Sequence, residues 1–579
     1  MSIRLRVTLL VITMVLSVFG VRLFQIQGLD PQAYAARAQA AGLVHLDLPA
    51  TRGDIVDRNG AMLAQSVSGL MIVADPQVTA PHAEPIARIL ADRLHLDYFD
   101  VLDQLRKPGT QFAYIARRVP AAKASKVVQE IDAAGYHGVD TRNDPLRDYP
   151  GGDVAANIIG FLGVRTDGQG HIIPAAGLEQ SFNKLLSGRD GHDTYEVGGG
   201  NRIPLGENTE VRPVNGKQLK LTIDRDAQWY AQRILRQTVH QVRAQSGAVI
   251  AMDSRTGQVL AMADYPTYDA NRGSKASLGD IGSRALGDVY EPGSVEKVLT
   301  ASALLQQGKE TPRTRIVVPP VIQVQGKPIH DWYGHGRIHL TLTGAIAKSS
   351  NIGVALASRA ISSPVMGRYL QRFGLGTKTG VPVPGESRGL LPDPNSWSEL
   401  THANIAFGQG LAVNALQMTA AVNTIANGGE YISPSLILGR ATTDSGRVVG
   451  SDVAKTRRVV SARTARKVRN MMEMVLAEGK GIAPGMAIPG YRVAGKTGTA
   501  QEVGAKCGCY DGSLDVSFAG IAPADHPRFT VYAVIKHPLA GASGAGTAGP
   551  VVRKLLIYLL QKYAVPPTGS KPPNLPVTW

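Results

Sequence analysis

The chain has almost no cysteine and no grouping of side chains that follows a known zinc pattern. The only cysteines in its 579 residues are Cys507 and Cys509, with one residue between them. A bridge across one residue closes a strained small ring, so a disulfide and two free thiols both stay open. No further zinc ligand is near them in the sequence, and His330, His335 and His339 lack the glutamate of a zinc protease. The sequence therefore predicts no metal site.

The chain also lacks basic runs interleaved with aromatic residues, although it is strongly basic. Lysine and arginine number 62 against 46 aspartates and glutamates, a formal net charge of +16. Without an aromatic and basic stretch, this charge does not indicate nucleic-acid binding. It suits a protein beside anionic lipids and polymers, and we expect no nucleic-acid partner.

Long apolar runs are absent except at the N-terminus. Residues 7–26 carry no charge apart from Arg22. About 20 residues reach about 30 Å as a helix, enough for a bilayer if the arginine extends to the interface. The first small-residue cleavage pattern, Ala36-Arg-Ala38, lies too far downstream for a signal peptide. Arg4 and Arg6 place the preceding tail in the cytoplasm. The sequence predicts a single-pass membrane anchor with the remaining chain outside.

Three short motifs occur in order in the second half of the chain. They are Ser294-Val-Glu-Lys297, Ser349-Ser-Asn351 and Lys496-Thr-Gly-Thr499. A serine is a poor nucleophile until a base takes its proton, and a lysine one helical turn away can do this. Each motif alone is common, but the ordered set is hard to obtain by chance and is typical of serine acyl-transfer enzymes that react with penicillin.

The local sequence around the first motif favours a buried helix. Glu291-Pro-Gly293 breaks the chain, apolar residues follow from Val295, and Gly308 ends the run. Ser294 is thus expected at a helix N-terminus, where free N–H groups favour developing negative charge. Burial of Lys297 would help to keep its amine neutral enough to act as a base.

The third motif is predicted to lie on a strand, residues 492–500. Gly498 lacks a side chain where another backbone could lie alongside, as in strand addition of an extended peptide. Lys496 supplies positive potential for a peptide carboxylate, and Thr497 and Thr499 supply hydroxyl donors. We therefore expect this strand to bind substrate.

Apolar runs on either side of these motifs predict an antiparallel sheet covered by helices, an α+β fold. One hairpin is expected from 248–252 and 259–263, a second from 516–522 and 528–535, and a closing helix over 551–563. No catalytic set occurs before the glycine-rich and charged tract near residues 188–215. The predicted organisation is a cytoplasmic tail (1–6), an anchor (7–26), a non-catalytic domain (29–205), a catalytic domain (213–565) and a proline-rich tail (566–579).

These motifs and three further segments resemble the class B penicillin-binding proteins. Residues 52–60 (Arg-Gly-Asp-Ile-Val-Asp-Arg-Asn-Gly) are similar to the signature that opens the non-catalytic domain of that family. Gly177-Leu-Glu179 with residues 186–191 resembles its second signature, and Tyr290-Glu-Pro-Gly-Ser294 is similar to the division-specific, FtsI-like subgroup. The resemblance implies a transpeptidase domain, an elongated pedestal domain for interactions or dimerisation, and one transmembrane helix.

The resemblance also implies a role for each motif residue in acylation by a peptidoglycan stem peptide ending in D-Ala-D-Ala. Ser294 would attack the carbonyl between the two alanines, and Lys297 would accept its proton. Ser349 would relay a proton to the departing alanine, and Asn351 would orient Lys297 and the substrate amide. Lys496 would help to hold the carboxylate. No metal or organic cofactor is needed.

Binding roles and partners follow from the same resemblance. Thr497, Gly498 and Thr499 would hold the carboxylate end of the substrate or of a β-lactam, and the N–H groups of Ser294 and Thr499 would form the oxyanion hole. The expected partners are a membrane glycan polymerase (FtsW-like), other division proteins and the lipid bilayer. A D,D-carboxypeptidase, a β-lactam sensor or scaffold and a β-lactamase are the alternatives, and septal synthesis is favoured over elongation.

Overall fold

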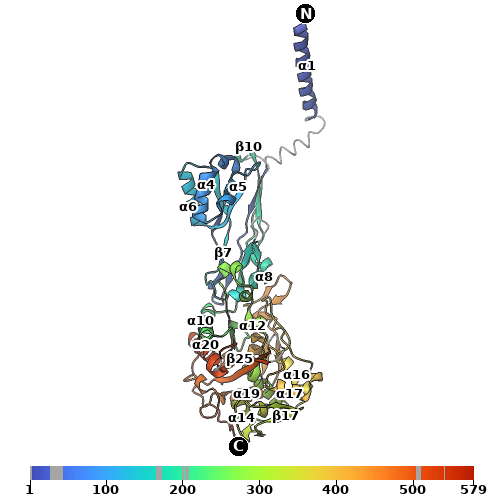
Figure 1. Cartoon of the computed structure of the whole chain (residues 1–579), viewed down its shortest axis with the longest axis vertical. Helices are drawn as coiled ribbons and strands as arrows, with labels where there is room; N and C mark the ends of the chain where they lie inside the picture. The colour runs from blue at the N-terminus through green and yellow to red at the C-terminus, as the bar shows by residue number, and fades with distance from the viewer. Residues whose placement is uncertain are drawn as a thin grey trace. The chain divides into compact units, whose positions relative to one another are not determined.

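The computed structural model describes residues 3–25, 43–164, 172–198, 201–202, 208–503, 510–539 and 542–579. The chain forms two compact units (Figure 1). Unit 1 contains residues 1–52, 68–146 and 187–216, and unit 2 contains residues 53–67, 147–186 and 217–579. The two units interleave along the chain. Cys507 and Cys509 lie outside the described residues.

Helix α1 (Ile3–Phe24) contains residues 7–24 of the predicted anchor. Its segment Val7–Phe24 has a mean hydropathy of 2.3 and is not buried against the rest of the chain. By length and composition this helix can cross a membrane.

Unit 1 contains a small helix-covered sheet in which β4 (Gly69–Ala74) pairs antiparallel with β5 (Ala113–Pro120) and β6 (Val139–Asn143). Apolar residues of α4 (Ala83–Leu94) and α6 (Ala121–Ala133) form one core with these strands. The other elements of unit 1 are β1 (Leu43–Leu48), α3 (Pro76–Thr79), α5 (Tyr98–Leu105), β10 (Gly191–Gly198), β11 (Asn201–Arg202) and β12 (Thr209–Val211).

Each of the two family-like signatures has a structural carboxylate in unit 2. Asp57 accepts hydrogen bonds from the N–H groups of Asn59 (2.7 Å), Ala61 (2.8 Å) and Arg225 (3.0 Å), which closes the turn between β2 (Ile55–Val56) and β3 (Met62–Val67). Glu179 in the second signature is fully buried and pairs with Arg147 at 2.7 Å. A buried carboxylate needs such a partner, so this ion pair fixes the local packing.

The central sheet of unit 2 has five antiparallel strands in the order β15-β14-β26-β25-β24. Their bounds are β14 (Ser246–Asp253), β15 (Val259–Tyr265), β24 (Ala494–Val503), β25 (Tyr510–Ala522) and β26 (Phe529–Lys536). Both predicted hairpins are confirmed, as is the strand that carries the third motif. Strand β24 lies at the edge of this sheet, so one side of it has no partner strand in the described fold.

Helices cover both faces of this sheet. Helices α10 (Arg225–Gln241) and α20 (Gly549–Lys562) pack together on one face, near β25 (Figure 1). The approach is close, because a Cβ added at Gly520 would lie 2.7 Å from Val552 of α20. On the other face, Asn423 of α18 (Ala415–Ala426) accepts a hydrogen bond from Thr530 of β26. The α+β prediction is confirmed, and α20 is the predicted closing helix.

Smaller elements of unit 2 surround this framework. They are β7 (Leu146–Asp148), α7 (Ala156–Ile159), β8 (Leu162–Val164), β9 (Ile172–Pro174), α8 (Gly177–Ser181), α9 (Asn183–Ser187), β13 (Leu219–Lys220), η3 (Ala270–Lys275), α11 (Leu278–Ile281), α12 (Arg284–Gly287), η4 (Gly293–Val295), α13 (Lys297–Gln306), β16 (Arg315–Val318), β17 (Ile322–Val324), β18 (Lys327–Ile329), β19 (Ile338–Thr341), α14 (Leu342–Ala347), α15 (Asn351–Ser358), α16 (Ser363–Arg372), η5 (Pro394–Ser396), α17 (Glu399–Ala406), β20 (Glu430–Ile432), β21 (Ala441–Thr442), β22 (Val448–Val449), η6 (Ser451–Val453), β23 (Thr456–Arg458), α19 (Ala462–Glu473), η7 (Pro484–Met486) and η8 (Gly544–Ala548).

Candidate active site

Ser294 lies in a single helical turn, η4 (Gly293–Val295), which we call the serine turn. The α-helix α13 begins three residues later, at Lys297, so the predicted helix start is displaced by one turn. Gly293 has φ +53°, and a Cβ there would lie 2.7 Å from the Thr499 carbonyl oxygen. Glycine therefore lets the serine turn lie directly against β24. The Ser294 hydroxyl is half-buried and donates no hydrogen bond within the described residues.

Lys297 is fully buried at the start of α13. Its Nζ lies 2.7 Å from the Ser349 carbonyl oxygen and 2.7 Å from Asn351 Oδ1, and 3.4 Å from Ser349 Oγ. Burial lowers the pKa of Lys297 to about 7, against the charges of Asp331 and Glu296, which raise it. A large fraction of this amine is therefore neutral near pH 7 and able to accept a proton.

Ser349 connects the two motif lysines. Lys496 Nζ donates to Ser349 Oγ at 2.9 Å and to the Thr497 carbonyl oxygen at 3.0 Å. Burial, and then the neighbouring Lys297, lowers the pKa of Lys496 well below its ordinary value. Ser349 itself has φ +59°, a backbone conformation that residues other than glycine rarely adopt. Such strain is typical of functional sites, and here it turns one hydroxyl toward two buried amines.

The third motif lies on a strand, as predicted, and this strand is at the edge of the sheet. A Cβ at Gly498 would lie 2.2 Å from Ser517 Oγ and 3.0 Å from the Pro292 carbonyl oxygen. The backbone that approaches Gly498 is therefore the chain's own serine turn, and this contact accounts for the glycine without an incoming peptide. Thr499 is exposed beside this turn, while Thr497 is buried. Beside the serine turn, the strand thus exposes the Thr499 side chain, whereas the Lys496 amine is buried.

Asp331 belongs to the site but was not predicted from the sequence. Asp331 has a fully buried side chain and accepts hydrogen bonds from Ser350 Oγ (2.7 Å), from the Ile352 N–H (3.0 Å) and from His335 Nε2 (3.0 Å). These contacts fix the chain on both sides of Asn351, whose Nδ2 donates to the His330 carbonyl oxygen at 2.9 Å. No local pattern identifies Asp331, because its partners around the second motif are 19 and 21 residues away. His335 of this loop is a polar partner of Asp331.

Glu296 is a buried neighbour that takes no part in this cluster. Its carboxylate accepts from Thr300 Oγ1 one helical turn later, at 2.8 Å. Burial raises the pKa of Glu296 well above its ordinary value. This contact agrees with the structural role expected from the sequence.

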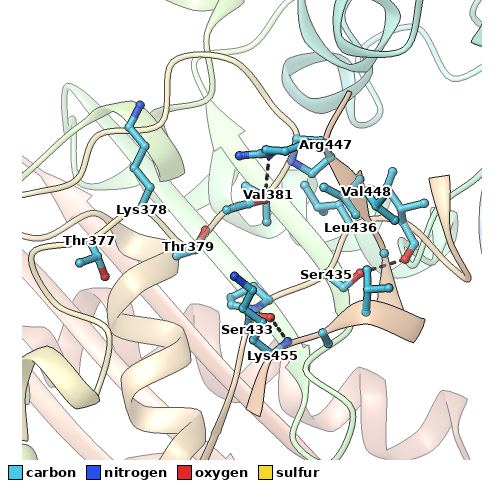
Figure 2. A pocket seen from close by; sticks show the side chains of 18 of the residues that line it. Thr377, Lys378, Thr379, Val381, Ser433, Ser435, Leu436, Arg447, Val448 and Lys455 are labelled. Atoms are coloured by element: carbon cyan, nitrogen blue, oxygen red, sulfur yellow. Dashed lines mark hydrogen bonds between the residues drawn. The ribbon is translucent and has the colours of Figure 1, made fainter. Parts of the chain in front are cut away.

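A separate hollow of about 320 Å³ lies elsewhere in unit 2 (Figure 2). Its walls include residues 377–382, 433–437 and 447–450, with Lys378 and Lys455 at its edge. Arg447 donates to the Gly380 carbonyl oxygen at 3.1 Å across it. None of the residues of the three motifs line this hollow, so its size does not make it the candidate active site.

Two family models match the chain. The penicillin binding protein transpeptidase domain matches residues 247–557, and the penicillin-binding protein dimerisation domain matches residues 47–221. The first model covers the central sheet and all three motifs. The protein is therefore a transpeptidase of the serine type. It belongs to the penicillin-binding proteins, and its dimerisation domain places it in class B.

Relatives cover nearly the whole chain. Penicillin-binding protein PbpB of Mycobacterium tuberculosis is 36% identical over 98% of this chain and 86% of its own length. Peptidoglycan D,D-transpeptidase FtsI of Escherichia coli is 32% identical over 95% of this chain and 91% of its own. The crystal structure of penicillin-binding protein 3 from M. tuberculosis, complexed with aztreonam, superposes with a TM-score of 0.70 at 32% identity, covering 92% of this chain and all of that one.

Proposed function

We propose that this protein is a peptidoglycan D,D-transpeptidase that cross-links stem peptides through an acyl-enzyme on Ser294. The observation that carries this proposal is the pair of buried lysines, Lys297 and Lys496, both within 3.4 Å of one serine hydroxyl beside the serine turn. Two lysine amines can lie this close because burial lowers the pKa of both, so they need not both carry a charge. The arrangement supplies a base and a proton relay without a metal.

Acylation begins when the neutral Lys297 amine takes the proton of Ser294. The Ser294 oxygen then bonds to the carbonyl carbon between the two terminal D-alanines, and the backbone N–H groups of Ser294 and Thr499 hold the oxyanion. The peptide C–N bond breaks, and the proton passes from Lys297 through Ser349 to the departing amine. Asn351 accepts a hydrogen bond from Lys297 through its Oδ1. In this proposal Asn351 also orients the substrate amide.

Substrate binding falls to the exposed edge of β24. An extended stem peptide would add to this edge, with its carboxylate beside Thr499 and Thr497 and in the positive potential of Lys496. Gly498 contributes by allowing the serine turn to lie against the strand. A β-lactam carries a carboxylate and a strained amide in the same places, so it would acylate Ser294 and remain there as an inhibitor.

The acyl group is then transferred to an amine of a neighbouring stem peptide, which forms the cross-link. A D,D-carboxypeptidase would use the same acylation with water as the acceptor, and a sensor or scaffold would stop at acylation. The deciding experiment supplies a stem-peptide donor with an amine acceptor and measures cross-linked and hydrolysed products separately. We expect cross-linked product to dominate, and hydrolysis alone would favour the carboxypeptidase.

A matched pair of variants links this activity to the site. Ser294→Ala should abolish both products. Ser302→Ala, eight residues later on the buried face of α13, should retain them because the Ser302 hydroxyl only donates to the Val298 carbonyl oxygen. Cross-linking by Ser294→Ala would contradict the proposed nucleophile.

The proposed location is the cell membrane, with α1 as the only anchor within the described residues. Arg4 and Arg6 at its start favour a cytoplasmic N-terminus, because basic residues are retained on that side. The catalytic unit would then face outward, where its substrate is. Protease added to intact spheroplasts should degrade the catalytic unit, whereas protection would reverse this orientation.

The domain before the transpeptidase domain would select the partner and the cellular process. Its sequence shows no catalytic nucleophile with a general base beside it. It would instead bind a membrane glycan polymerase (FtsW-like) and other division proteins. We propose septal synthesis, which the likeness to FtsI supports. A fluorescent fusion should concentrate at mid-cell and depletion should give filaments. A fusion spread along the side wall would instead indicate elongation.

A further inference from the structure

Three potential metal ligands converge at the end of the central sheet, outside the three motifs. A carboxylate oxygen of Glu502, a carboxylate oxygen of Asp515 and a ring nitrogen of His537 all lie within 4.8 Å of one another. They come from β24, from β25 and from the residue after β26. They are the one such group of three among the described residues. Only the fold brings them together, since no spacing in the sequence predicts the cluster.

Two local departures from regular backbone direct side chains into this cluster. The pairing of β24 with β25 changes register between Gln501 and Val503, at Glu502. Such irregularities re-aim a side chain and are frequent beside active sites. His537 has φ +50°, which is rare for a residue with a side chain. Its ring contacts the Glu502 carboxylate.

The carboxylate of Asp515 is incompletely satisfied. Asp515 is only 3% exposed, and its Oδ1 is buried without a hydrogen-bond partner. A buried carboxylate oxygen without a partner is costly, so native structures usually satisfy it with a donor, a water molecule or an ion. A cation at the centre of the cluster would satisfy this oxygen.

We propose that Glu502, Asp515 and His537 bind a divalent transition-metal ion, with Zn²⁺ as the best match. One imidazole and two carboxylates are a ligand set that zinc accepts, with a water molecule as the fourth ligand. Lys536 lies 3.5 Å from Glu502 Oε1 and balances one of the two carboxylate charges. A bound ion would replace the contact between the His537 ring and Glu502 and would neutralise the remaining carboxylate charge.

Such an ion would join β24 to the ends of β25 and β26. Glu502 follows Thr499 by three residues, about 10 Å along the strand. The site is therefore distinct from the proposed catalytic cluster but lies on the strand that would bind substrate. Its role would be to hold the end of that strand, and it takes no part in acyl transfer.

The test uses the full-length protein in detergent, freed of metal with a chelator and titrated with zinc chloride by calorimetry. We expect one zinc ion per chain. His537→Ala and Glu502→Gln should each lower the zinc affinity by more than about 100-fold, since loss of an outer partner alone typically costs 10–100-fold. Both replaced side chains are partly exposed, and penicillin acylation would report whether each variant folds.

His526→Ala is the matched control, because His526 also lies beside an aspartate but is 75% exposed in the turn between β25 and β26. It should bind zinc as the unchanged protein does. Failure of the unchanged protein to bind zinc would overturn the proposal. So would retention of zinc by either cluster variant, or its equal loss in His526→Ala.

Discussion

Asparagine in place of Asp331 should loosen the second motif and shift the pH dependence of acylation. Asparagine keeps one carbonyl oxygen for the Ile352 N–H, but its amide nitrogen cannot accept from His335 or Ser350. The serine hydroxyl can turn and accept instead, so about one charge-assisted hydrogen bond is lost, worth about 1.5–3 kcal/mol. Unit 2 has about 420 residues. With the usual unfolding entropy per residue, the lost free energy lowers the Tm by about 2–3 °C.

The kinetic effect of Asp331→Asn has a definite sign. Burial lowers the pKa of Lys297 to about 7, and the charge of Asp331 opposes that shift. Removing the charge lowers the pKa further, so the rise of the acylation rate with pH should move to lower pH.

The assay is the rate of acylation by a fluorescent penicillin between pH 5 and 9. Asp393→Asn is the control, because Asp393 caps an exposed turn far along the chain. An unchanged midpoint, or a shift to higher pH, would refute the reasoning.

Three further changes test other parts of the account. Lys297→Ala should slow penicillin acylation by about 10²–10⁴-fold, the usual scale for a lost base, and a normal rate would exclude this role. Gly498→Ala should slow acylation strongly, because its methyl group would lie 3.0 Å from the Pro292 carbonyl oxygen. Gly282→Ala is the control, because a methyl group there meets open space and should not change the rate. Equal rates for the two variants would refute this packing. Glu179→Gln should destabilise the protein by about 3–5 kcal/mol in denaturant titrations, because it leaves Arg147 buried and unpaired; a loss below 1 kcal/mol would contradict this.

Sequence reasoning predicted most of the fold around the site because local patterns determine it. Alternating and continuous apolar runs identified both hairpins and the closing helix. The helix start was displaced because the proline and glycine before Ser294 form a short separate turn that packs on β24. That contact depends on the distant residue Thr499, which periodicity cannot reveal.

The site was predictable as far as its residues belong to compact motifs. Ser349 and both lysines meet in the structure, but the left-handed backbone of Ser349 has no signature in its sequence. Asp331 was missed because it acts on the second motif from a separate loop. Gly498 was predicted to let another backbone approach, and the sequence could not show that the Pro292 carbonyl oxygen would lie 3.0 Å from a Cβ there.

The most direct test of the central claim is mass spectrometry of the intact protein and its peptides after reaction with penicillin. The account predicts one covalent adduct, on the peptide that contains Ser294, and none in Ser294→Ala. It also predicts that the adduct forms faster as the pH rises through about 7, because the pKa of buried Lys297 lies there. An adduct that persists in Ser294→Ala, or one found on another serine, would contradict the account.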